Sequence, residues 1–173
     1  MELRRLYFFT ATILNWQPLL MNREYKHILI NSLLHLSKRK KIAVYAFVIM
    51  PNHIHLIWEL LEENGKELPH ASFLKFTSHT FLKILRIKQP DALASFKTES
   101  STRKHQFWQR DALAIELYTP AVIYQKLNYI HNNPCQGKWM LAENPVEYPY
   151  SSAKFYEFGN DEFGFMQHIG ERI

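Results

Sequence analysis

Two histidines stand one residue apart in a hydrophobic stretch, MPNHIHLIW at residues 50–58. Successive side chains of a β-strand point to opposite faces, so His53 and His55 would share one face and the apolar residues around them the other. Residues at this spacing have α-carbons roughly 6.6 Å apart, which lets two imidazoles lean toward one point. Because neutral imidazole is a common metal ligand, the pair predicts half of a metal site. The alternative is a pair of hydrogen-bonded or solvated histidines at a strand edge.

A second stretch, YQKLNYIHNNP at residues 124–134, is predicted to be helical. Threonine and proline at residues 119–120 supply an N-cap hydroxyl and a first helical residue, and the last proline of the stretch ends the helix. A four-residue spacing puts Tyr129 and Asn133 on one polar face, which Lys126 shares. Tyrosines at such positions are often packing residues with a solvated hydroxyl. The other interpretation is a nucleophile beside a polar ligand.

Length and composition indicate one packed domain over residues 1–173, with a core at about 4–135 and a C-terminal tail at about 136–173. The chain is 47% hydrophobic and 21% charged, which excludes a disordered class. A net charge of +5 and a pI of about 9.3, with 14% aromatic residues, favour an anionic partner such as nucleic acid. A basic but ordinary soluble enzyme would have the same composition.

Several function classes have no support in the sequence. Cys135 is the single cysteine, so neither a disulfide framework nor a cysteine zinc cluster is expected. The sequence contains no glycine-rich phosphate loop of the GxxxxGK[ST] type. The basic and then apolar N-terminus mimics a signal peptide but lacks a small-residue cleavage site, and no apolar run reaches the roughly 20 residues of a membrane helix. We therefore expect a cytoplasmic protein with no membrane partner.

The periodicity of the apolar residues predicts four strands and three helices. The first six elements follow the split βαβ order, which indicates an α+β, ferredoxin-like fold: an antiparallel sheet with helices on one face. The seventh is a C-terminal helix that carries Tyr129. In chain order these are a strand at 4–14, a helix at 22–40, strands at 42–49 and 53–60, a helix at 70–88, a strand at 107–118 and a helix from 120 to about 133.

Four fragments occur in the same order as in a known family: YAFVIMPNHIHLIW, FWQRD, YIHNNP and EYPYSSAKFY. Together they resemble the REP-associated tyrosine transposases, which belong to the HUH single-tyrosine transposases. The resemblance extends from the first strand to about Tyr156. It implies a ferredoxin-like sheet that carries both histidines, with a nucleophilic tyrosine on the following helix. It also implies a divalent metal, single-stranded DNA with a hairpin (a REP-like element), and no nucleotide cofactor.

The resemblance assigns roles to four residues. His53 and His55 match the paired metal ligands, Tyr129 matches the nucleophile, and Asn133 falls where related transposases often have glutamine as a third ligand. The implied reaction is metal-dependent endonuclease and strand transfer through a 5′-phosphotyrosine intermediate. The cation would be Mg²⁺ or Mn²⁺, with two histidines favouring Mn²⁺. A homodimer is possible, since some related transposases share active sites between two copies.

Positive side chains offer a surface for the DNA backbone, although a charged helix face is often only solvated. Trp108 is expected in the core, and Tyr148 and Tyr150 could contact DNA or pack. The candidate DNA-binding residues are Arg4, Arg5, Lys75, His79, Lys83, Arg86, Arg103, Lys104 and Arg110.

Two other functions compete with the transposase. The first is a domesticated protein that binds single-stranded DNA hairpins without cleavage. A pure binder has no physical need for His53, His55 and Tyr129 together. The second is an RNA-binding module on a similar sheet, which usually carries an aromatic GFGF-type strand motif that this sequence lacks.

Overall fold

A four-stranded antiparallel sheet forms the centre of the computed structural model, which describes residues 1–98 and 104–173. The strands lie in the order β2-β3-β1-β4, so β3 separates the two strands that α1 connects. This order confirms the predicted ferredoxin-like, α+β arrangement. The strands are β1 (Leu6–Thr12), β2 (Ile42–Met50), β3 (His53–Leu60) and β4 (Leu113–Glu116).

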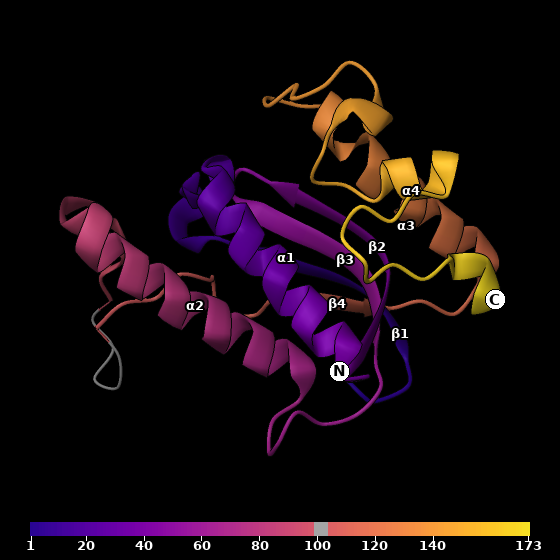
Figure 1. The fold of residues 1–173 in the computed structure, drawn as a ribbon, viewed down its shortest axis with the longest axis horizontal. Coiled ribbons are helices and arrows are strands. Elements are labelled where there is room, and N and C mark those ends of the chain that lie inside the picture. The colour runs from indigo at the N-terminus through magenta and orange to yellow at the C-terminus, as the bar shows by residue number, and fades with distance from the viewer. Residues whose placement is uncertain (99–103) are drawn as a thin grey trace.

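Helices lie on both sides of the sheet (Figure 1). The helices α1 (Arg23–Lys38) and α2 (Pro69–Lys88) cover one face, while α3 (Pro120–Asn132) and α4 (Ala153–Phe158) lie on the other side. The prediction of helices on one face therefore holds for α1 and α2, and the C-terminal helix has its own face. Short 3₁₀ helices span Leu14–Trp16, Leu19–Met21, Pro90–Phe96, Asn133–Cys135, Pro145–Glu147 and Ile169–Glu171.

Two side-chain caps explain where α1 and α3 begin. The Asn22 side chain accepts a hydrogen bond from the Glu24 N–H at 2.9 Å. The Thr119 hydroxyl accepts one from the Val122 N–H at 3.4 Å, and proline follows it at the first helical position. Each cap satisfies a backbone N–H that has no partner within the helix. Both helix starts predicted from the sequence are confirmed.

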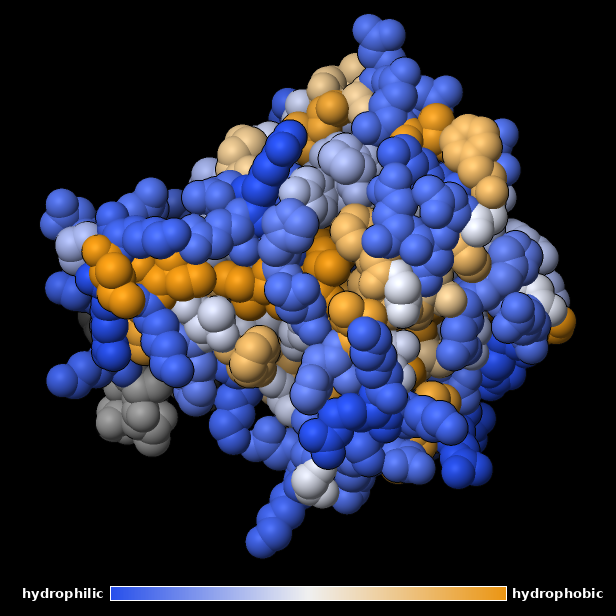
Figure 2. All heavy atoms as spheres, in the orientation of Figure 1, coloured by the Kyte–Doolittle hydropathy of each residue, from blue (hydrophilic) through white to orange (hydrophobic). Residues whose placement is uncertain are grey.

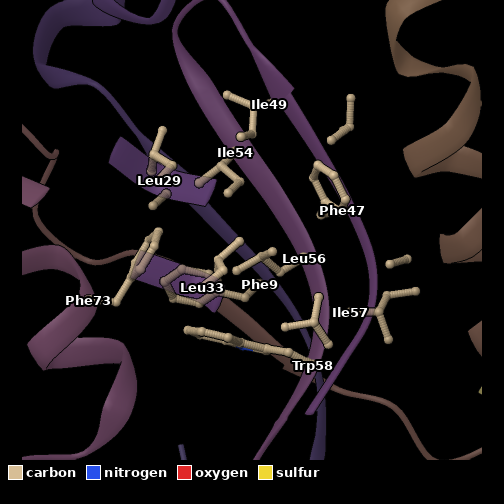
Figure 3. Close-up of a cluster of buried hydrophobic side chains, with 14 of the residues drawn as sticks. Phe9, Leu29, Leu33, Phe47, Ile49, Ile54, Leu56, Ile57, Trp58 and Phe73 are labelled. Carbon is tan, nitrogen blue, oxygen red and sulfur yellow. The ribbon is translucent and has the colours of Figure 1, made fainter. Parts of the chain in front are cut away.

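The hydrophobic core fills the space between the sheet and the α1–α2 layer, and Phe47 and Ile57 extend it on the other face of the sheet (Figure 3). Trp58 of β3 packs on Phe9 of β1 with ring centroids 5.0 Å apart, and on Phe73 of α2 at 6.2 Å. Leu33 of α1 joins them, and all four side chains are buried. Burying one side chain of this size stabilises the fold by about 1.5–3 kcal/mol. This layer fixes which face of β3 points inward and leaves the histidine face to α3.

Two of the strands predicted from the sequence are longer than the strands in the structure. The strand predicted at 4–14 is confirmed only as β1, since Arg4 has φ 60° and a 3₁₀ helix begins at Leu14. The strand predicted at 107–118 is interrupted at Asp111, also at φ 60°, so only β4 remains. Residues before Asp111 still pair with the end of β1, where the Gln109 N–H donates to the Thr12 carbonyl at 2.7 Å. A residue with left-handed backbone conformation interrupts the hydrogen-bond pattern between the two strands, but the segments on either side of it stay paired.

The C-terminal tail pairs with the outer edge of β2. The Ile49 N–H donates to the Tyr150 carbonyl at 2.9 Å, and further along the tail the Gln167 N–H donates to the Val44 carbonyl at 2.9 Å. Covered edges do not offer free backbone groups to other chains. Tyr148 is buried, with its hydroxyl donating to the Ile49 carbonyl at 2.6 Å. Tyr148 and Tyr150 thus pack in the interior rather than offering a DNA surface.

The face of the molecule drawn in Figure 2 is mostly hydrophilic. A band of hydrophobic side chains interrupts it over α1 and α2. Within residues 1–98 and 104–173, no helix combines the length and the apolar character that crossing a membrane requires.

Candidate active site

The two histidines of β3 lie side by side on the sheet face opposite α1 and α2. The centroids of the His53 and His55 rings are 4.6 Å apart, and the His55 side chain is only 5% exposed. In the register between β1 and β3, His53 is paired with Thr12 and His55 with Thr10. The prediction that both imidazoles share a face is confirmed.

Each imidazole is oriented through its Nδ1 atom. His53 Nδ1 lies 2.7 Å from Asn52 Oδ1, and His55 Nδ1 lies 2.7 Å from Thr10 Oγ1. With Nδ1 donating, Nε2 keeps its lone pair, as in metal-binding histidines whose second nitrogen is held by an outer partner. His55 Nε2 is buried and has no hydrogen-bond partner among the described residues. Such an atom in a native interior is completed by a water molecule or an ion, and a cation suits its lone pair.

Both histidines are neutral at neutral pH. Burial lowers the pKa of His53 to about 4, while a side-chain hydrogen bond with Asn133 acts in the opposite direction. Burial lowers the pKa of His55 to about 3, and the charges of His53 and Lys126 add to this effect. Burial removes water from the protonated imidazolium and so disfavours it, and a nearby positive charge disfavours it further. Neutral imidazole is the form that binds metal.

Tyr129 stands on α3 directly against the histidine pair. Its ring centroid is 5.3 Å from that of His55 and 5.9 Å from that of Phe8 in β1. The side chain remains 46% exposed, so a substrate can reach it. Tyr118 and Tyr124 are also exposed, but in the described part of the chain neither ring contacts a histidine ring. The structure thus brings one accessible tyrosine to the histidine pair.

Asn133 completes the cluster at the end of α3. It opens the 3₁₀ helix Asn133–Cys135, is half-buried, and hydrogen-bonds through its side chain to His53. The described residues contain no group of three or more histidine, cysteine, aspartate or glutamate side chains able to hold a metal. A third ligand here would therefore be a neutral oxygen, which an asparagine amide provides. The donor set of two imidazoles and one amide fits Mn²⁺ or Mg²⁺.

Sequence reasoning did not assign a role to three residues of the site. Asn52 and Thr10 orient the imidazoles, and Lys126 of α3 places its ammonium 4.9 Å from the Phe8 ring centroid. The position of Asn52 directly before the histidine pair was a usable signal. Thr10 had none, because only the pairing of β1 with β3 brings it to His55.

Three candidate DNA-binding residues line a groove of about 510 Å³ between α2 and residues 105–110. They are Lys75, His79 and Arg110. Lys75 also pairs with Glu67 at 2.6 Å, as exposed lysines often do. Trp108 lines the groove but is buried, with its indole N–H donating to the Thr77 hydroxyl at 3.0 Å, which confirms its core position. Because α2 lies on the core side of the sheet, the groove is separate from Tyr129.

The other candidate cations are spread over the surface. Lys83 and Arg86 are exposed on α2, and Lys104 is exposed directly before His105. Arg4 and Arg5 border a second hollow of about 390 Å³, where Arg5 lies 3.4 Å from Glu116. Arg103 lies outside the described residues. His105 lines the groove, and besides burial the charges of Arg86 and Lys104 lower its pKa, so these two cations lie beside the groove.

The chain thus combines an antiparallel ferredoxin-like sheet with a histidine pair that faces a tyrosine-bearing helix. This combination can be compared with known proteins. No family model matches the sequence, and no curated protein matches it. Among solved structures, the chain is similar to a REP-associated tyrosine transposase bound to a REP hairpin, with a TM-score of 0.62 and 17% identity. The match covers 95% of this chain and 87% of that chain. The likeness shows that the two share a fold.

Proposed function

We propose that this protein cleaves and rejoins hairpin-bearing single-stranded DNA through a covalent bond to Tyr129. The observation that carries the proposal is the contact between the accessible Tyr129 ring and His55, whose buried Nε2 has no partner in the part of the chain that the structure describes. A nucleophile, two neutral imidazoles and an amide then converge from one strand and one helix. Such convergence on a rigid scaffold is what phosphoryl transfer requires.

The reaction conserves the phosphodiester energy. The Tyr129 oxygen attacks the phosphorus, a new oxygen–phosphorus bond forms, and the bond to the 3′ oxygen breaks. The phenol loses its proton, and the departing 3′ oxygen gains one, so a free 3′-hydroxyl and a 5′-phosphotyrosine result. Attack of that 3′-hydroxyl on the phosphotyrosine reverses the cleavage, and attack of another 3′-hydroxyl joins the DNA to a new strand. Either attack releases Tyr129. No nucleotide cofactor is consumed.

His53, His55 and Asn133 would hold the divalent cation. When bound, Mg²⁺ or Mn²⁺ supplies a Lewis acid for the phosphate. The chain itself keeps both imidazoles neutral by burial and fixes their orientation through Asn52 and Thr10. Because Mn²⁺ accepts imidazole ligands more readily than Mg²⁺, which binds mainly oxygen, Mn²⁺ is the better ion for a binding assay.

The DNA partner is proposed to be a hairpin with single-stranded flanks. The structurally similar transposase is bound to a REP hairpin, and the basic groove beside α2 suits a phosphate backbone here. Lys75, His79 and Arg110 would contact it on the core side of the sheet, while a flanking strand reaches Tyr129. A cytoplasmic location and a homodimer are further parts of the proposal.

The test is a cleavage assay on end-labelled single strands that carry hairpins from the genomic DNA flanking this gene. With Mn²⁺ the wild type should form a protein–DNA adduct that survives denaturing electrophoresis, and a chelator should prevent it. Hairpin binding without adduct or cleavage under any divalent cation would instead establish the domesticated binding function.

A further inference from the structure

Lys126 places a positive charge beside the candidate nucleophile. Its Nζ lies 4.9 Å from the ring centroid of Phe8 and 5.8 Å from that of Tyr129. The Phe8 ring is itself stacked on His55, with centroids 5.3 Å apart. Lys126 precedes Tyr129 by three residues on α3, so the two side chains lie on one face of the helix. The ammonium therefore borders the same small space as the histidine pair.

No acidic side chain in residues 1–98 or 104–173 pairs with this ammonium. Lys41 and Lys154 reach carboxylates at 2.9 and 3.0 Å, respectively. Lys126, by contrast, forms no hydrogen bond or ion pair with any residue that the structure describes, and its contacts are the two aromatic rings. It is half-buried, and its charge helps to disfavour protonation of His55. An unpaired, partly desolvated cation is a site prepared for an anion.

We propose that Lys126 is a catalytic residue whose ammonium binds a non-bridging oxygen of the phosphodiester that Tyr129 attacks. This inference rests on the function proposed above. It adds a charged group to the site that neither the histidine pattern nor the structural comparison assigns.

The chemistry requires only that Lys126 keep its proton. As Tyr129 attacks, negative charge accumulates on the phosphate oxygens, and a fixed ammonium stabilises that charge more than it stabilises the ground state. Lys126 neither donates nor accepts the transferred proton, which moves from the phenol to the 3′ oxygen through solvent. The same ammonium would act in the rejoining step, because both directions share one transition state.

The rings give Lys126 a defined position. A long flexible side chain in solvent would lose rotamer freedom on binding a phosphate, whereas the faces of Phe8 and Tyr129 already hold this ammonium. An arginine would retain the charge and the ring contact with a different donor arrangement. A methionine would retain the packing of the stem without the charge.

The experiment compares wild type, Lys126→Met and Lys126→Arg in single-turnover adduct formation on the labelled hairpin strand with Mn²⁺. We expect Lys126→Met to slow the covalent step roughly 100-fold or more while changing hairpin affinity less than threefold. Lys126→Arg should recover at least a tenth of the wild-type rate. Lys38→Met, which removes one exposed lysine charge at the end of α1, should react like the wild type. Circular dichroism would verify that each variant folds.

Each outcome decides between the two claims. If the wild type forms the adduct and Lys126→Met forms it at the same rate, Lys126 has no such role and the proposed function stands. A slow Lys126→Met without recovery in Lys126→Arg, or with an equal loss of hairpin affinity, would also overturn it. If the wild type forms no adduct, the proposed function fails, and the role of Lys126 fails with it.

Discussion

At the scale of single residues, the environment of His55 is costly unless a ligand completes it. A buried polar atom without a partner costs on the order of 1–3 kcal/mol, and within residues 1–98 and 104–173 His55 Nε2 has none. Its other nitrogen is already held by Thr10. The free protein is therefore less stable than it would be with this atom hydrogen-bonded, while the imidazole stays neutral and oriented for a ligand.

Metal binding should depend on the two histidines more than on the asparagine. In calorimetry with Mn²⁺, His55→Ala should abolish the measurable heat, because it removes a pre-oriented imidazole. Asn133→Ala should only weaken binding, since a water molecule is also a suitable oxygen ligand for Mn²⁺ and can replace the amide oxygen. Equal losses in the two variants, or no heat with the wild type, would count against the proposed ligand set.

The sequence predicted which face of its strand or helix each site residue occupies. It did not predict which residues of other elements contact the site. Spacing within one strand or one helix places His53 with His55 and Tyr129 with Asn133, since the period of each element is fixed. The approach of Thr10 depends on the register between β1 and β3, and that of Lys126 on where α3 rests on the sheet. Both are tertiary facts that no local pattern encodes.

At the scale of elements, α2 and residues 105–110 make the groove that we assign to DNA. Arg110→Ala should lower hairpin affinity and reduce the slope of log K against log salt by about 0.9, because one phosphate contact releases about that many counterions. Filter binding at several salt concentrations measures both. Lys38→Ala, which removes a charge from the exposed end of α1, serves as the control. An unchanged slope in Arg110→Ala would remove this residue from the DNA surface.

The pairing between the tail and β2 should contribute measurably to stability. Tyr148 accepts a hydrogen bond from the Lys26 ammonium at 2.9 Å and donates one to the Ile49 carbonyl. Tyr148→Phe leaves a buried ammonium and a carbonyl without that partner, so the free energy of unfolding should fall by about 1–3 kcal/mol. Denaturant unfolding measures it. Tyr118→Phe, at a 75% exposed tyrosine, should change almost nothing, and equal effects would contradict the assignment.

Element types were predictable where periodicity was strong, and boundaries were not. The apolar faces of α1 and α2 and the caps at Asn22 and Thr119 placed three helices within about two residues. The left-handed conformation of Asp111 and the pairing of the tail with β2 could not be predicted. A non-glycine residue with positive φ has only a weak sequence signal, and the tail pairs with residues about 100 positions away.

At the scale of the whole molecule, buried histidines should make stability depend on pH. Burial lowers the pKa of His131 to about 4, and its Nε2 is within 2.9 Å of the Ser152 hydroxyl. Between pH 4 and 6.5 the unfolded chain then binds more protons than the folded one. Stability from this group is complete above pH 6.5 and is lost as the pH falls toward 4.

In the presence of a chelator, the free energy of unfolding should therefore decrease as the pH is lowered from about 6.5 to about 4. The share of His131 is on the order of 3 kcal/mol, given 1.36 kcal/mol for each pKa unit. His131→Gln can keep a hydrogen bond to Ser152 but does not titrate, so its pH dependence should be shallower. Identical curves for the two proteins would contradict a neutral His131 in the folded protein.

The central claim is that Tyr129 forms the covalent bond to DNA. The most direct measurement is mass spectrometry of peptides from the trapped adduct, combined with Tyr129→Phe, which removes only the hydroxyl. We predict a 5′-phosphorylated nucleotide on the peptide that contains Tyr129, and no adduct from Tyr129→Phe although it still folds and binds the hairpin. An adduct on Tyr124 or any other residue, or one that persists in Tyr129→Phe, would contradict the claim.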